Sequence, residues 1–233
     1  VLKESLRNHL LPHLVSFATG ALLGAAFLGL LPHALASANS TDTHVIPMAV
    51  LLGLLGFFLL EKLVLWRHCH ADHCEVHAPD DHSRDHSTGA MILLGDGLHN
   101  FLDGILIAAA FLTDIHLGIV TSLAVAAHEI PQEVGDFAVL LHSGFSRKRA
   151  FLYNVLTSLT TVFGGVLSYF ALQSMQNVLP YVLAIAASSF IYIAVADLIP
   201  TLHRRVEGRA TLQQVLLIAA GILLIYSTHS TLH

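Results

Sequence analysis

Apolar residues fill seven long runs that are separated by short polar segments. The runs cover about residues 12–36, 46–66, 89–112, 116–142, 150–172, 179–202 and 212–229. At a rise of about 1.5 Å per residue, a helix of this length crosses the roughly 30 Å hydrocarbon layer of a lipid bilayer. We therefore predict an all-α fold, a polytopic bundle with seven transmembrane spans.

The composition agrees with a protein that lies within the bilayer. Of the 233 residues, 55% are hydrophobic and only 12% are charged, and the mean hydropathy is +0.69. These values lie outside the usual range of soluble globular domains. The two cysteines, Cys69 and Cys74, lie close together in one polar segment, so they imply no disulfide framework. We expect one transmembrane domain over residues 1–233.

The basic residues orient the predicted spans. If all seven runs cross the membrane, the eleven Lys and Arg residues fall on one side, namely Lys3, Arg7, Lys62, Arg67, Arg84, Arg147, Lys148, Arg149, Arg204, Arg205 and Arg209. The segments on the other side, 37–45, 113–116, 173–178 and 230–233, contain none. By the positive-inside rule the basic side is cytoplasmic. We expect a multi-pass protein of the cell (inner or plasma) membrane.

Histidine is unusually frequent, with 17 residues, and many of them lie in the polar segment 67–88. This segment is acidic and has no apolar periodicity. His/Cys-rich tracts of this kind can bind metal ions, but a solvated loop would have the same composition. Both interpretations stay open for this predicted cytoplasmic loop.

A second group of polar residues interrupts the third and fourth spans. The third span carries Asp96, His99, Asn100 and Asp103 on one helical face, and the fourth carries His128, Glu129, Gln132, Glu133 and Asp136 on two adjoining lines. The short connection makes the two spans antiparallel neighbours. Asp103 and His128 then both lie roughly 21 Å from the cytoplasmic ends. His99 and Gln132 both lie roughly 15 Å from these ends, with Asn100 and Glu129 in between.

These carboxylates have no Lys or Arg within reach, because every basic residue lies at the inner margin. They must be protonated when the site is empty or be neutralised by a bound cation. Imidazole together with carboxylate and amide oxygens suits Zn²⁺ better than Ca²⁺ or Mg²⁺, and it also admits Fe²⁺, Mn²⁺ or Cd²⁺. A purely structural role is the alternative, although ionisable groups inside a membrane are functional by default. Asp197 fits an exit ligand and an interfacial residue equally well.

The residues around these groups resemble the ZIP (Zrt/Irt-like) family of divalent-metal transporters. Segment 99–104 (HNFLDG) resembles the family's fourth-helix motif HNFxDG, and segment 128–136 (HEIPQEVGD) resembles the LIV-1 signature HExPHExGD. Leu31-Pro32-His33 and segment 196–200 (ADLIP) resemble the ends of two further family helices. The resemblance covers essentially all seven spans.

The resemblance implies that His99, Asp103, His128 and Gln132 contribute to one transport site. It implies that Asn100 and Glu129 contribute to an adjacent site. Two departures are clear: Gln132 replaces the second histidine of the signature, and the span 150–172 has no acidic residue. The second departure argues against a complete second metal site.

The family has eight helices with both termini outside, so the resemblance also implies that the first family helix is missing from the seven predicted here. An added helix before residue 1 would preserve the orientation derived from the basic residues.

We predict a transporter rather than an enzyme, one that moves zinc as its substrate toward the cytoplasm. The expected partners are divalent metal ions and the lipid bilayer, with a homodimer as the candidate assembly and no nucleic acid. An intramembrane zinc hydrolase is the alternative, although the H-E-x-x-H pattern fails at Gln132. A membrane metal sensor that uses the segment 67–88 is a third hypothesis.

Overall fold

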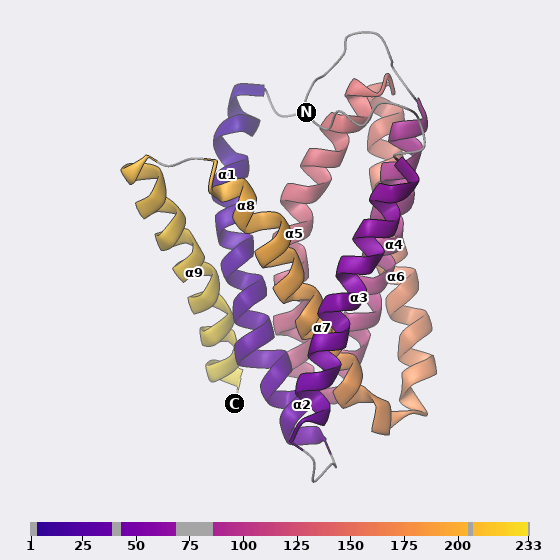
Figure 1. Cartoon of the computed structure of the whole chain (residues 1–233), viewed down its shortest axis with the longest axis vertical. Helices are drawn as coiled ribbons and strands as arrows, with labels where there is room; N and C mark the ends of the chain where they lie inside the picture. The colour runs from indigo at the N-terminus through magenta and orange to yellow at the C-terminus, as the bar shows by residue number, and fades with distance from the viewer. Residues whose placement is uncertain (1–3, 39–42, 69–85, 205–206, 233) are drawn as a thin grey trace.

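The computed structural model describes residues 4–38, 43–68, 86–204 and 207–232, and its long elements in these ranges are all helices (Figure 1). The elements are α1 (Glu4–Gly24), η1 (Ala25–Leu30), α2 (Leu31–Ser37), α3 (Val45–His68), α4 (His86–Thr113), α5 (Ile115–His142), α6 (Arg147–Gln173), η2 (Gln176–Val178), α7 (Leu179–Tyr192), η3 (Ile193–Leu198), α8 (Ile199–Leu202) and α9 (Gly208–Leu232). Both α1–η1–α2 and α7–η3–α8 are continuous helical segments, so seven segments run up and down the bundle. The predicted all-α bundle is confirmed. The histidine-rich segment predicted at 67–88 lies almost entirely outside the described residues.

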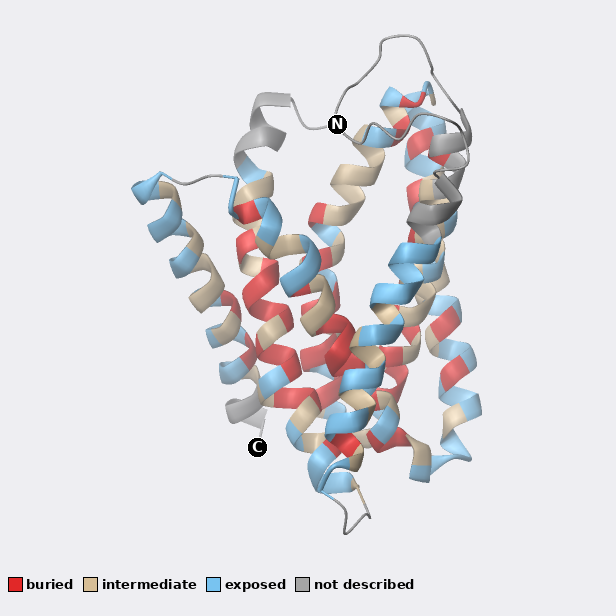
Figure 2. Ribbon diagram, in the orientation of Figure 1, coloured by how far each residue is buried: buried red, intermediate tan, exposed pale blue. Residues whose placement is uncertain are grey.

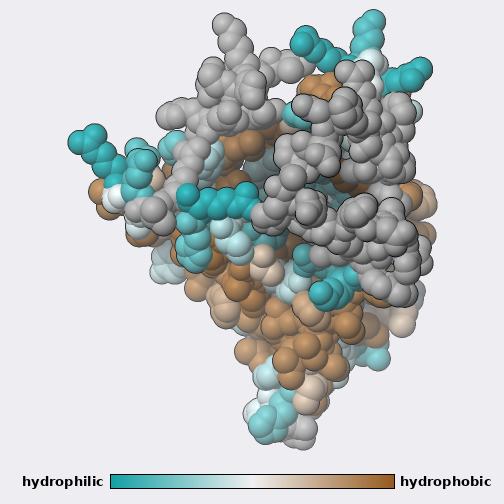
Figure 3. Space-filling view, turned by 45° about the horizontal axis from the view of Figure 1, so that its top comes forward, coloured by the Kyte–Doolittle hydropathy of each residue, from teal (hydrophilic) through white to brown (hydrophobic). Residues whose placement is uncertain are grey.

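The surfaces of the bundle are suited to lipid. Six helical segments of the described chain are long and apolar enough to cross a membrane, and α5 has the same length but is interrupted by the polar residues of 128–136. Large apolar side chains are exposed along α3, α6 and α9, among them Leu52, Leu59, Leu159, Phe163, Phe170, Leu212 and Leu223. Figure 3 shows hydrophobic side chains across the lower flank, with hydrophilic side chains above them and at the lower tip. The protein is a multi-pass membrane protein.

The core is packed unevenly along the bundle. Fully buried side chains concentrate near α2 and the beginnings of α5 and α7, where Leu30, Leu117, Val120, Leu183 and Phe190 have no exposed surface. Figure 2 shows this buried region in the lower half, whereas the upper half is more exposed. The upper half ends at the beginnings of α6 and α9, which carry Arg147 and Arg209 (Figure 1). The end of the bundle that carries these arginines is therefore the less tightly packed one.

Two glycines let α4 approach α6 closely. A Cβ atom added at Gly104 would lie 2.1 Å from the carbonyl oxygen of Thr161, and one added at Gly164 would lie 2.3 Å from the carbonyl oxygen of Phe101. Small residues allow this backbone contact, which is a common means of association for helices in lipid. The close packing brings the polar face of α4 directly against α6.

Candidate metal site

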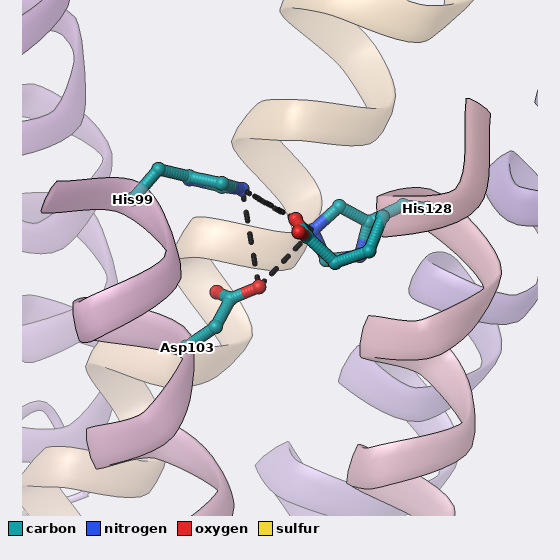
Figure 4. Close-up of side chains that lie close together, drawn as sticks. His99, Asp103 and His128 are labelled. Atoms are coloured by element: carbon teal, nitrogen blue, oxygen red, sulfur yellow. Dashed lines mark hydrogen bonds and ion pairs between the residues drawn. The ribbon is translucent and has the colours of Figure 1, made fainter. Parts of the chain in front are cut away.

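Four side chains that could hold a metal ion converge between α4 and α5. His99 and Asp103 come from α4 and His128 comes from α5 (Figure 4). Glu129, the fourth, also comes from α5. His128 Nε2 lies 3.2 Å from Asp103 Oδ2 and 3.3 Å from His99 Nε2. Glu129 Oε1 lies 3.4 Å from the Nε2 atom of each histidine. We call these four residues the histidine–carboxylate cluster.

The spacing of the cluster matches a tetrahedral metal shell. Zn²⁺ binds imidazole nitrogen and carboxylate oxygen at about 2.0–2.1 Å, so ligand atoms at the corners of a tetrahedron are about 3.3–3.4 Å apart. The five separations that involve a histidine nitrogen run from 3.2 Å to 3.8 Å, and the two carboxylate oxygens lie within 4.8 Å of each other. Asp103 and His128 are each only 1% exposed, which keeps water from competing for two of the four positions.

The turn between α4 and α5 sets the register of the cluster. One residue, Asp114, separates the helices, and its carboxylate caps α5 by accepting from the backbone N–H of His116 at 2.8 Å and of Leu117 at 2.9 Å. Partial burial opposes ionisation of Asp114, but the hydrogen bonds from Leu117 and His116 hold the pKa of this carboxyl below its usual range. The tight turn places His128 opposite Asp103.

Gln132 lies outside the histidine–carboxylate cluster. Its Nε2 donates to Asp96 Oδ1 at 3.3 Å. The resemblance groups Gln132 with the two histidines and Asp103, whereas the structure brings Glu129 to the fourth position. The reason is geometric: Gln132 lies one turn further along α5, at the level of Asp96 on the antiparallel helix.

A second group of possible ligands adjoins the first. Asp96, Glu129 and Glu133 each place one carboxylate oxygen within 4.8 Å of the others, and we call them the three-carboxylate group. Asp96 is 5% exposed, and its Oδ2 has no hydrogen-bond partner among the described residues. Glu129 belongs to both groups. Asp136 and Asp197 belong to neither, although Asp136 interacts electrostatically with all three carboxylates.

Asn100 is buried but is hydrogen-bonded within the protein. Its Nδ2 donates to Asp96 Oδ1 at 3.0 Å and to the Asp96 carbonyl oxygen at 3.2 Å, and its Oδ1 accepts from Thr161 at 2.7 Å. The sequence did not predict that α6 contacts the site, because this helix has no acidic residue to mark it as a source of metal ligands. Polar residues at 154, 157, 158 and 161 share one helical face, and this spacing was the available signal.

A groove of about 580 Å³ reaches the two groups from the side of α5 and α6. Asn100, Glu129, Glu133 and Ser158 contribute to its lining. On the opposite side, the ring of Phe190 from α7 covers His128, with the ring centroids 6.3 Å apart. The site is therefore sealed by an aromatic ring on one side and accessible on another.

Together, the fold and the site define a helical multi-pass membrane protein in which a cluster of side chains that could hold a metal ion lies between two helices. The family model described as "ZIP Zinc transporter" matches residues 2–90 and 67–228. The chain therefore belongs to the ZIP zinc transporter family, as its motifs predict.

Similar proteins carry names of the same kind. The chain is 34% identical to zinc transporter ZIP13 of Pongo abelii over 228 residues, which cover 91% of this chain and 65% of that protein. It is 39% identical to zinc transporter ZIP10 of Homo sapiens over 150 residues, 60% of this chain and 18% of the relative. It is 31% identical to zinc transporter zipt-7.2 of Caenorhabditis elegans over 266 residues, 93% of this chain and 58% of the relative. The chain thus spans less than two thirds of the length of each relative.

Proposed function

We propose that this protein carries zinc across a membrane and that the histidine–carboxylate cluster binds the ion during transport. The observation that carries the proposal is the cluster itself: two imidazole nitrogens and two carboxylate oxygens at tetrahedral spacing within a membrane bundle. This mixed set of ligands suits Zn²⁺ and also admits Fe²⁺, Mn²⁺ and Cd²⁺. The names of the relatives agree with zinc as the substrate.

The three-carboxylate group is proposed as a second stop for the ion on the same route. Glu129 belongs to both groups, so an ion can exchange ligands without entering a region that lacks charged groups. Asp136 lies further along α5 toward the less tightly packed end, and Asp197 lies in η3. We propose these two residues as later contacts on the exit route.

The uneven packing supports transport toward the cytoplasm. The cluster lies beside the tightly packed half of the bundle, and the other half, which ends at the basic residues, is less buried (Figure 2). If this end faces the cytoplasm, as the positive-inside rule predicts, the structure represents an inward-facing state. Import then requires an alternate state in which the packed half opens around Phe190 and Leu183.

The hydrolase alternative has less support from the geometry. In the H-E-x-x-H pattern the glutamate is a general base and does not bind the metal. Here Glu129 Oε1 lies 3.4 Å from both histidine Nε2 atoms and fills a ligand position. The second histidine of the pattern is replaced by Gln132, which contacts Asp96 instead.

Zinc uptake by proteoliposomes that contain the purified protein tests the proposal. We expect His99→Ala and Glu129→Ala each to lower the initial rate of uptake by about tenfold or more, because each variant loses a direct ligand. Leu159→Ala, on the lipid-exposed face of α6, is the control and should transport like the parent. If His99→Ala took up zinc at the parental rate, the cluster would not be the transport site.

A further inference from the structure

The polar face of α6 contacts both of the helices that provide the metal ligands. Asn154 Nδ2 donates to the carbonyl oxygen of Glu133 at 2.8 Å, and Ser158 Oγ donates to Glu133 Oε1 at 2.6 Å. Thr160 Oγ1 donates to the carbonyl oxygen of Gly97 at 2.7 Å. Together with Thr161, these residues hold α4 and α5 against α6, and two of them contact side chains of the candidate site.

Thr161 fixes the orientation of the Asn100 amide. The Asp96 carbonyl oxygen can only accept a hydrogen bond, so the Asn100 amide nitrogen must face Asp96. The amide oxygen then faces Thr161, whose hydroxyl donates to it at 2.7 Å. Without this hydroxyl, the buried amide oxygen would lose its partner and the amide could turn away from Asp96.

The orientation of Asn100 determines in turn which carboxylate oxygen of Asp96 is hydrogen-bonded within the protein. Asp96 Oδ1 accepts from both Asn100 and Gln132, so this oxygen is engaged within the protein. The other oxygen, Oδ2, is buried and has no hydrogen-bond partner among the described residues. Thr161 acts on Asp96 through Asn100, and Ser158 acts directly on Glu133. Helix α6 therefore holds two members of the three-carboxylate group.

We propose that Thr161 and Ser158 are positioning residues that control which metal the site accepts, without binding the metal themselves. This inference rests on the proposed function. An all-oxygen group suits Mn²⁺ better than a mixed nitrogen and oxygen cluster does. The geometry of the three carboxylates therefore influences the ratio of zinc transport to manganese transport. Loss of such an outer contact typically costs 10–100-fold in metal affinity.

The chain offers a matched pair of variants for the test. Thr161→Val and Thr160→Val each remove one hydroxyl from α6 that donates to α4 at 2.7 Å. The Thr160 hydroxyl donates to backbone carbonyl oxygens, those of Gly97 and Thr157, whereas the Thr161 hydroxyl donates to a side chain that is hydrogen-bonded to a carboxylate. A purely structural role predicts similar effects for both variants. A positioning role predicts an effect on metal selectivity for Thr161→Val alone.

Transport kinetics in proteoliposomes should separate the two roles. We expect Thr161→Val to change KM for zinc by about tenfold and to change the ratio of zinc to manganese transport, while Thr160→Val keeps the parental ratio. Thr161→Ser keeps the hydroxyl and should restore both values. Ser158→Ala should also change the ratio, whereas Ser158→Thr should preserve it. Thermal midpoints in detergent should be similar for the two valine variants.

Two results would overturn the inference. The first is that Thr161→Val transports zinc and manganese in the parental ratio. The second is that Thr160→Val and Thr161→Val change this transport ratio equally. If the parent moved no zinc, the proposed function would fail, but the inference could still be tested by equilibrium binding. In that measurement, Thr161→Val would have to change the relative affinity for zinc and manganese, and Thr160→Val would have to keep the parental value.

Discussion

At the scale of single residues, Gln132 occupies the position at which the LIV-1 signature has histidine, and its hydrogen-bond partner is Asp96 rather than a residue of the histidine–carboxylate cluster. Its amide nitrogen donates to Asp96 Oδ1, and Glu129 completes the histidine–carboxylate cluster. An amide is a weaker ligand for Zn²⁺ than an imidazole is. Gln132 therefore supports a carboxylate rather than adding a strong ligand of its own.

Replacing Gln132 with histidine should strengthen zinc binding. Gln132→His introduces an imidazole one helical turn from His128, beside Asp96 and Glu129. We expect KM for zinc to fall by about tenfold, equivalent to about 1.4 kcal/mol. We also expect the ratio of zinc uptake to manganese uptake to rise. Uptake by proteoliposomes with both metals present measures this change.

Gln132→Leu is the control, because it removes the amide without adding a ligand. It should not lower KM for zinc. An unchanged KM in Gln132→His would show that position 132 does not reach the transported ion.

At the scale of elements, the site depends on the close packing of α4 and α6. The motif glycine Gly104 lies one residue after the proposed ligand Asp103, on a turn of α4 that touches the backbone of α6 at Thr161. A side chain at this position would separate the helices. The same separation would lengthen the hydrogen bond from Thr161 to Asn100, so helix packing and ligand orientation are coupled.

The packing at Gly104 leads to a prediction about stability. Gly104→Ala should lower the thermal midpoint of the purified protein, because the added Cβ would lie 2.1 Å from the Thr161 carbonyl oxygen. Overpacking of this kind typically costs about 1–3 kcal/mol. Gly95→Ala in the same helix is the matched control, since a Cβ added there has no heavy atom within 4 Å. Equal midpoints for the two variants would contradict the role of close packing at Gly104.

At the scale of the whole molecule, one end of the bundle is more tightly packed than the other. Fully buried residues gather near the turn that contains Asp114, while Arg147 and Arg209 lie toward the opposite end (Figure 2). In the proposed alternating access, this asymmetry corresponds to a state that admits the ion from the less tightly packed end. The orientation of the protein in the membrane would then determine the direction of the proposed transport.

The natural cysteines provide a test of the orientation. Cys69 and Cys74 follow α3 in the chain, in a segment predicted to face the cytoplasm. A membrane-impermeant maleimide should therefore leave them unmodified in intact cells and label them after permeabilisation. Ser174 follows α6 at the other end of the bundle. In a protein with both natural cysteines changed to serine, the cysteine of a Ser174→Cys variant should be labelled in intact cells. Labelling of Cys69 or Cys74 in intact cells would reverse the proposed orientation.

The sequence by itself predicted the helices and the pair of helices that carries the site. A long apolar run is a local property, because the cost of placing each residue in hydrocarbon depends mainly on that residue. The helical repeat then groups Asp96, His99, Asn100 and Asp103 on one face, and the short connection between the two spans predicts their relative level. These features need no knowledge of distant neighbours.

The tertiary structure alone decided which polar residues share a group. The repeat of a helix does not set how the helix is rotated against its neighbours or which rotamer a side chain adopts. Packing against α6 and α7 determines both, so Glu129 lies beside the two histidines and Gln132 is hydrogen-bonded to Asp96. The contact between Thr161 and Asn100 spans 61 residues of sequence and exists because Gly104 and Gly164 let the helices touch.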